Sequence, residues 1–289
     1  MTKWTGKTRG NALGYRIFIF SIKILGLPVG YFILRFVSLY FYFFVPEKKW
    51  FIEDFYLNYV KLDKSIIQST IRKNFYQLGQ SLLDKIAFSV GKGDRIKYIE
   101  EGEHYLSELS AAGKGAFLFS GHVGNWDIAG NLLKRIGTNV SVVMYQNEQE
   151  EIQKLLTAES TVPKFNIIPI GEDLSHLVKI YSAIKRGDLV CMHADRYLEG
   201  AKTEEISFLG KPAKFPIGPF QLVEKLKVPY SFVFAIKEKN YLYSFSATKP
   251  VIEHRKARDI AGDFVLLLEE KVRAHPEQWY NYFSFHDKE

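Results

Sequence analysis

Apolar and polar positions follow an alternating pattern from residue 115 onward. Short apolar runs typical of buried strands alternate there with stretches whose apolar residues recur at helical spacing. The predicted strands are residues 115–119, 140–145, 166–170 and 189–193. The predicted helices between them are residues 125–135, 148–157 and 174–185. This alternation predicts an α/β fold with a largely parallel sheet flanked by helices.

The C-terminal third breaks this alternation. Residues 198–219 are rich in Gly, Lys and Pro, which predicts a loop. A short helix is expected at 220–226, followed by a hairpin whose strands are 230–237 and 241–248. The last predicted element is an amphipathic helix over residues 259–273.

The N-terminal part is apolar enough to meet a membrane. Ile17 to Val45 is a hydrophobic stretch of 29 residues, whereas a helix needs about 20 to cross a bilayer. Pro28 with the neighbouring glycines predicts a break in it, so one tilted span and a kinked, half-inserted anchor both fit, and a buried core helix is the alternative. Residues 50–100 look helical. We therefore predict an N-terminal membrane-anchor helix within residues 1–49 and a second domain over residues 50–289.

Composition narrows the possible functions. The 289 residues include 23 Phe and 17 Tyr and carry a formal net charge of +7, as in proteins that bind nucleic acid or anionic membranes. No Lys/Arg-rich block or RNA-binding signature is present, so we expect no nucleic-acid partner. The single cysteine, Cys191, excludes an intrachain disulfide and multi-cysteine metal clusters. No P-loop or dinucleotide fingerprint occurs, and we expect no metal and no cofactor.

The main candidate for chemistry lies between the first predicted strand and its helix, in the sequence Ser-Gly-His-Val-Gly-Asn-Trp-Asp over residues 120–127. His122 is expected in a glycine-flanked turn before the helix, and Asn125 is a good N-cap. Asp127 in the first helical turn is placed either to orient the imidazole or simply to face the helix dipole. The spacing alone is not specific, because His254 and Asp259 repeat it in a charged stretch.

Further candidates follow another strand and the Pro-rich loop. Asp195 and Arg196 closely follow the predicted strand at 189–193. We expect them to lie at the same edge of the sheet as His122. Arg196 is then either a phosphate clamp or part of a surface ion pair. The helix beginning near Gly218, beside Lys211, is either an anion site or a tight connection. His193 is expected to be a packed histidine, and the absence of Gly-x-Ser-x-Gly weighs against an α/β-hydrolase.

Five segments in order resemble one family. Gly-His-x-Gly-Asn-Trp-Asp, Asp-Arg, Phe-Leu-Gly, Pro-x-Gly-Pro and a C-terminal Pro-Glu-Gln-Trp occur here in succession. They resemble the late acyltransferases of lipid A biosynthesis, the lauroyl/myristoyl transferases of the lysophospholipid acyltransferase superfamily. The N-terminal hydrophobic segment also fits, and the resemblance covers nearly the whole chain.

The resemblance implies O-acyl transfer from acyl carrier protein or acyl-CoA to a hydroxyl of a membrane glycolipid, a lipid A precursor. It also implies a bacterial inner-membrane enzyme with its catalytic domain, residues 50–289, on the cytoplasmic face. By this analogy His122 is the general base and Asp127 orients it, although the family often has Glu at that position. The substrate-binding residues are expected to be Asn125, Trp126, Asp195, Arg196, Lys211 and Gly218.

The C-terminal tail departs from the family pattern. The family commonly reads Trp-x-Trp-x-His-Arg-Arg after Pro-Glu-Gln, whereas Trp279 is followed here by Tyr-Asn-Tyr-Phe. This difference removes basic residues that could meet acceptor phosphates and leaves the acceptor open. An aminolipid, a lysophospholipid or a lipid-like secondary metabolite is the alternative acceptor, and a non-catalytic lipid-binding membrane protein is the alternative class.

Overall fold

A seven-stranded sheet forms the centre of the protein. The structure, a computed structural model, describes residues 12–133, 137, 139–145, 166–171 and 173–283. The strand order is β1-β9-β8-β2-β5-β3-β4. Their bounds are β1 Lys97–Glu101, β2 Ala116–Ser120, β3 Val140–Tyr145, β4 Asn166–Ile170, β5 Leu189–His193, β8 Tyr230–Lys239 and β9 Leu242–Ala247.

All neighbouring strands in this sheet are parallel except β8 and β9. The predicted parallel sheet and the predicted C-terminal hairpin are therefore both confirmed. β1 was not predicted, because it lies within the stretch expected to be helical and its side chains are mostly exposed. An edge strand of this kind lacks the buried apolar run by which the central strands are recognised.

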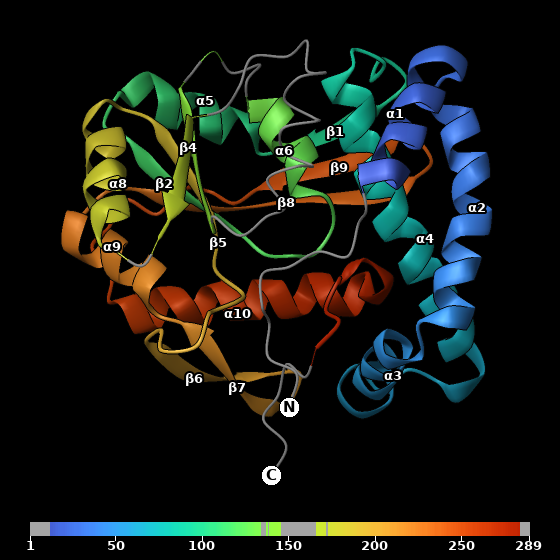
Figure 1. The fold of residues 1–289 in the computed structure, drawn as a ribbon. Coiled ribbons are helices and arrows are strands. Elements are labelled where there is room, and N and C mark those ends of the chain that lie inside the picture. Colours follow the sequence, from blue (N-terminus) through green and yellow to red (C-terminus); the bar gives the residue numbers. More distant parts are fainter. Residues whose placement is uncertain (1–11, 134–136, 138, 146–165, 172, 284–289) are drawn as a thin grey trace.

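Helices cover both faces of the sheet. In β2, Phe117 and Phe119 point to one face, where they join the core made with α8 (Ser175–Lys185), α9 (Gly218–Leu226) and α10 (Ala257–Ala274). Leu118 points to the opposite face, toward α5 (Glu103–Ala112) and α6 (Trp126–Leu133). This alternation is the two-residue period of a strand buried on both sides. Figure 1 shows α10 running along one side of the sheet.

The N-terminal helices form a third cluster beside β9. α1 (Ala12–Leu25) and α2 (Leu27–Phe44) meet at Gly26, whose φ of +83° suits glycine, so the predicted break is present. α3 (Pro46–Phe55) and a π-helical turn (Tyr56–Val60) lead into α4 (Lys64–Ser89). α2 packs along α4, and Figure 1 shows the two side by side.

The contact between α2 and α4 is close. A Cβ on Gly79 of α4 would lie 2.2 Å from a methyl group of Leu34. α2 has a mean hydropathy of 1.5 and is the one helix among the described residues that is long and apolar enough to cross a membrane. One side of α2 is nevertheless buried against the protein, at Leu27, Gly30, Tyr31, Leu34 and Ser38. The described helices before residue 50 thus share a core with α4 and β9, and the division into domains at 1–49 and 50–289 stays a prediction.

The prediction of a loop over residues 198–219 is partly wrong. It contains the antiparallel hairpin of β6 (Thr203–Phe208) and β7 (Lys211–Pro216). Leu209 and Gly210, both with positive φ, form the two-residue turn that such hairpins favour. The prolines in β7 made the sequence look unlike a strand, but they are tolerated because this two-stranded sheet has only edge strands. The helix predicted at 148–157 lies outside the described residues.

Candidate active site

His122 lies in the turn between β2 and α6, as predicted. Gly124 has a φ of +74°, and a Cβ there would lie 2.1 Å from the carbonyl oxygen of Ala235 in β8. Only glycine fits this approach. α6 begins at Trp126, and Asn125 Oδ1 accepts a hydrogen bond of 3.4 Å from the Ile128 amide, which confirms Asn125 as the N-cap.

The carboxylate of Asp195 holds His122 in two places. Nδ1 of His122 lies 2.7 Å from Asp195 Oδ1, and the His122 backbone amide donates to Oδ2 at 2.9 Å. Asp195 has no exposed surface. The two residues meet because β2 and β5 are parallel neighbours, with Ser120 in register with His193. The prediction that both motifs open onto one sheet edge is confirmed.

Burial and charge set the protonation of this pair. Burial lowers the pKa of His122 below 6.5, the Arg196 guanidinium lowers it further, and Asp195 opposes both. Burial alone would raise the pKa of Asp195, but His122 and Arg196 together hold it well below its ordinary value. Asp195 is therefore ionised and His122 neutral at pH 7. A neutral imidazole bonded through Nδ1 to a carboxylate is suited to accept a proton at Nε2.

Two aromatic residues pack around the imidazole. The His193 ring centroid lies 4.4 Å from that of His122, and Trp126 meets both rings edge-on, at 5.1 Å from His122 and 4.9 Å from His193. Burial, together with the nearby His122, lowers the pKa of His193 to about 3. His193 is thus a packed, neutral ring, as predicted.

Asp127, predicted to orient His122, has a different ion-pair partner. Its Oδ1 lies 3.0 Å from Nζ of Lys85 in α4, and both side chains are about a third exposed. The structure therefore places Asp195 at Nδ1 of His122 and brings Asp127 to Lys85. Sequence spacing singled out Asp127 because it is five residues from His122, whereas Asp195 is 73 residues away and meets His122 only through strand pairing.

Arg196 lies beside this pair, with its side chain largely buried. It donates from Nη2 to the carbonyl oxygen of Tyr280 at 2.7 Å, and its guanidinium lies 5.5 Å from the centroid of the Phe283 ring. Burial lowers its pKa to about 10, so it remains a cation at pH 7. The phosphate-clamp hypothesis for Arg196 stays a prediction. Nε of Arg196 also lies 3.9 Å from Asp195 Oδ2, so the observed contacts of Arg196 join Asp195 to the C-terminal segment.

The C-terminal segment forms part of the site, although the sequence did not predict it there. The Gly124 amide donates to the carbonyl oxygen of Gln278 at 3.0 Å, and the Tyr280 amide donates to that of His122 at 3.3 Å. Val123 and Trp279 form an isolated antiparallel bridge between these hydrogen bonds. The segment Pro-Glu-Gln-Trp therefore fixes the His122 turn from outside the sheet. Its place in the ordered motifs was the available signal, because alone it carries no reactive side chain.

Lys211 and Gly218, the residues of the predicted anion site, lie near opposite ends of one strand. Lys211 begins β7, Gly218 begins α9, and the extended strand between them puts about 16 Å between its two ends. Nζ of Lys211 instead lies 4.5 Å from the centroid of the Tyr59 ring. The strand β7 therefore separates the two residues along the chain, and their role in binding an anion stays a prediction.

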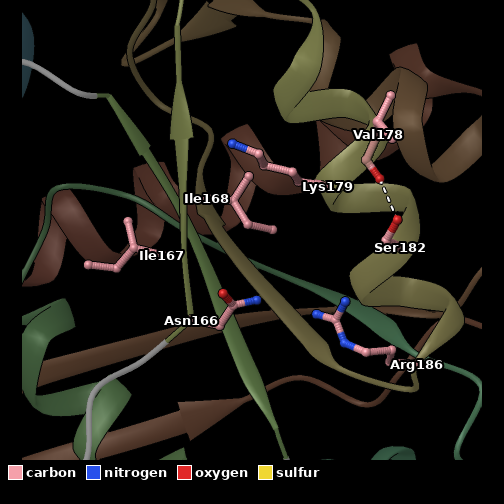
Figure 2. Close-up of a pocket in the computed structure, with 7 residues that line it drawn as sticks. All are labelled: Asn166, Ile167, Ile168, Val178, Lys179, Ser182 and Arg186. Atoms are coloured by element: carbon pink, nitrogen blue, oxygen red, sulfur yellow. Dashed lines mark hydrogen bonds between the residues drawn. The ribbon is translucent and has the colours of Figure 1, made fainter.

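Two further features are candidate ligand sites. His122, His193 and Asp195 have ligand atoms within 4.8 Å of one another, the residue types that hold a metal. Both oxygens of Asp195 already accept hydrogen bonds from His122, which favours proton transfer as the use of this group. Figure 2 shows a separate pocket between β4 and α8, where Ser182 donates to the carbonyl oxygen of Val178. Its lining residues include none of the predicted site residues.

A match to a known protein family relates this geometry to a function. Residues 63–285 match the family model for bacterial lipid A biosynthesis acyltransferases. The chain belongs to this family. The match begins at the N-cap of α4 and includes His122, Asp195 and the C-terminal segment. The resemblance read from the ordered motifs is confirmed, and membership supports an acyltransferase that acts on a lipid acceptor.

Curated relatives are similar over a shorter stretch. Two curated relatives are the phosphatidylinositol mannoside acyltransferases of Mycobacterium tuberculosis strains CDC 1551 / Oshkosh and ATCC 25618 / H37Rv. Each is 30% identical to this chain over 123 residues. The similar region is 42% of this chain and 38% of each relative. The aligned region therefore spans about two-fifths of the length of the relatives.

Proposed function

We propose that this protein is a membrane-associated O-acyltransferase that moves a fatty acyl chain from an acyl thioester to a hydroxyl of a glycolipid. The pairing of His122 with the buried Asp195 is the observation that carries the proposal. Acyl transfer from a thioester to an alcohol needs a base to remove the hydroxyl proton, and this pair supplies a neutral imidazole of fixed orientation. Family membership supports the acyl chain as the transferred group.

In the proposed mechanism His122 moves one proton twice. The Nδ1 proton stays on the ring in its hydrogen bond to Asp195, and Nε2 takes the proton of the acceptor hydroxyl as the oxygen attacks the thioester carbonyl. The tetrahedral intermediate then collapses, the carbon–sulfur bond breaks, and the departing thiolate takes the proton from Nε2. Asp195 stabilises the imidazolium formed between these steps.

The role of Asp127 is separate in this proposal. The resemblance assigns it to orienting His122, but its ion pair with Lys85 joins α6 to α4. We propose that Asp195 is the orienting carboxylate and that Asp127 holds the start of α6. The sequence-based assignment to Asp127 is the alternative.

A lipid A precursor is the proposed acceptor, and acyl carrier protein or acyl-CoA the proposed donor. Both the family name and the name of the mycobacterial relatives describe acylation of a glycolipid, which supports a sugar hydroxyl as the acceptor group. The aromatic residues after Trp279 keep an aminolipid, a lysophospholipid or a lipid-like secondary metabolite as the alternative acceptor. Tyr280 contacts Ser81, and Tyr282 donates to Asn74, so these two side chains pack inward. The position at which the family commonly has His is Phe283 in this chain.

We further propose that α1 and α2 attach the enzyme to the cytoplasmic face of the bacterial inner membrane. Their outer surfaces expose large apolar side chains that would be costly in water: Ile17, Phe20, Ile24, Leu25, Phe32, Phe36, Leu39, Tyr40, Phe43 and Phe44. Because the other side of α2 is buried against α4, the helix meets lipid along one side only. This arrangement favours the half-inserted anchor over a single lipid-surrounded span.

Lipid mass spectrometry of a deletion strain tests the function. One glycolipid should lose a single acyl chain, and its mass names both the acceptor and the chain length. Wild-type protein should restore that lipid, whereas His122→Ala should not, at equal amounts of folded protein. Restoration by His122→Ala, or accumulation of a lysophospholipid in place of its acylated product, would contradict the proposal.

A further inference from the structure

A buried polar cluster lies between the N-terminal helices and the sheet. Asp84 of α4 is its centre: Lys237 donates to Oδ2 at 2.6 Å, Tyr31 of α2 donates to Oδ1 at 2.5 Å, and Tyr243 of β9 also donates to Oδ2. All four residues are buried, Asp84 and Tyr243 completely. Burying an ion pair is weak evidence of stabilisation, because desolvation offsets the attraction.

This cluster reaches the catalytic turn through Asn125. Nδ2 of Asn125 donates to the Tyr243 hydroxyl at 3.1 Å and to the carbonyl oxygen of Ser81 at 3.2 Å. Its Oδ1 is the N-cap acceptor of α6. Asn125 is 3% exposed and its amide is satisfied inside the protein, so it is placed for positioning rather than for contact with substrate.

The direction of each hydrogen bond at the Tyr243 hydroxyl is fixed. Burial and the Asp84 carboxylate hold the pKa of Tyr243 well above 10, so the hydroxyl keeps its proton. That proton goes to Asp84, which leaves the oxygen to accept from Asn125 and from Lys237. A phenol can serve all three contacts at once, and a phenyl ring can serve none.

A second connection reaches the same turn from Lys237. The Gln278 side chain pairs with the backbone of Lys237, accepting from its amide at 2.9 Å and donating to its carbonyl oxygen at 2.8 Å. The backbone carbonyl of Gln278 accepts from the Gly124 amide. The turn that carries His122 is thus held on both sides by residues next to the cluster.

We propose that the link Asp84–Tyr243–Asn125 positions the catalytic turn. The Tyr243 hydroxyl sets the Asn125 amide, Asn125 sets the first turn of α6, and Trp126 there packs against the His122 imidazole. Tyr243 and Asn125 are positioning residues for the proposed acyl transfer, on which this inference rests. Small displacements of a base lower the rate steeply without weakening substrate binding.

A matched pair of variants tests the link. Tyr243→Phe and Tyr31→Phe each remove one phenol hydroxyl that donates to Asp84, but only the Tyr243 hydroxyl touches Asn125. For Tyr243→Phe we expect kcat to fall about tenfold with KM unchanged within about twofold. For Tyr31→Phe we expect both constants within about twofold of wild type. Equal kcat values for the two variants, whether reduced or not, would overturn the proposal.

A second variant and a second readout keep the test decisive. Asn125→Ser retains a capping oxygen and removes the amide that reaches Tyr243, so it should reproduce the kcat loss if Tyr243→Phe does not fold. NMR of the histidine side chains should show an altered His122 ring signal in Tyr243→Phe and a wild-type signal in Tyr31→Phe. This arm needs no substrate. If His122→Ala retains activity, the proposed function fails, yet the ring signal still decides the link, and an unaltered signal in Tyr243→Phe overturns it.

Discussion

At the scale of single residues, the site depends on a contact between distant parts of the chain. His122 was identifiable from its glycine-flanked turn, and Asp195 from its place after a strand. Their pairing was not predictable from spacing, because it depends on β2 and β5 being neighbours in register. Asp127, five residues from His122, was the carboxylate that local sequence favoured, although its observed ion pair is with Lys85.

The charge of Arg196 gives a pH prediction at this scale. Arg196 lowers the pKa of His122, so Arg196→Gln should raise it and move the acid limb of the kcat/KM profile to higher pH. In the wild type, burial as well as Arg196 should keep that limb below pH 6.5. Rates measured between pH 5 and 8 check both statements. A limb that moves to lower pH in Arg196→Gln would contradict the assignment of His122 as the titrating base.

At the scale of elements, the strands of the central sheet were predictable apart from β1 at one edge, and the hairpin of β6 and β7 was not. β2, β3, β4 and β5 were recognised as short apolar runs between helices. β1 is mostly exposed, and the β7 strand carries two prolines, so neither shows the pattern of a buried strand. The role of the C-terminal segment was hidden for another reason: it acts through backbone groups, which a sequence does not display.

The turn between β2 and α6 gives a prediction about stability. Gly124→Ala adds a Cβ against the Ala235 carbonyl in a left-handed backbone conformation, so it should lower the free energy of unfolding by at least about 2 kcal/mol. Gly113→Ala is the control, because Gly113 has a φ of +64° and no atom within 4 Å of the added carbon. Denaturant unfolding compares them. Equal losses would show that the Ala235 contact is unimportant.

At the scale of the whole molecule, the N-terminal helices belong both to the protein core and to the proposed membrane surface. The break at Gly26 was predictable from glycine and proline, but the division of α2 into a buried and an exposed side was not. Its apolar residues surround the helix, so hydropathy alone cannot tell which side packs on α4. Close packing of Leu34 on Gly79 is what decides it.

This arrangement predicts how membrane binding is lost. Phe36→Glu with Phe43→Glu changes two exposed rings of α2 and should weaken binding to anionic phospholipid vesicles at least tenfold, because each buried ring contributes about 1.5–3 kcal/mol. The melting temperature should stay near that of the wild type. Vesicle flotation measures the binding. Undiminished flotation would mean that another surface attaches the protein.

The most direct test of the account compares Asp195→Asn with Asp127→Asn. Acyl transfer is measured with the acceptor lipid found by mass spectrometry, and folding is checked by thermal unfolding. If Asp195 orients His122, Asp195→Asn should lower kcat by about 10²- to 10⁴-fold, because the amide favours the wrong imidazole tautomer. Asp127→Asn should have the smaller effect. The larger loss in Asp127→Asn, or full activity in Asp195→Asn, would contradict the proposed catalytic pair.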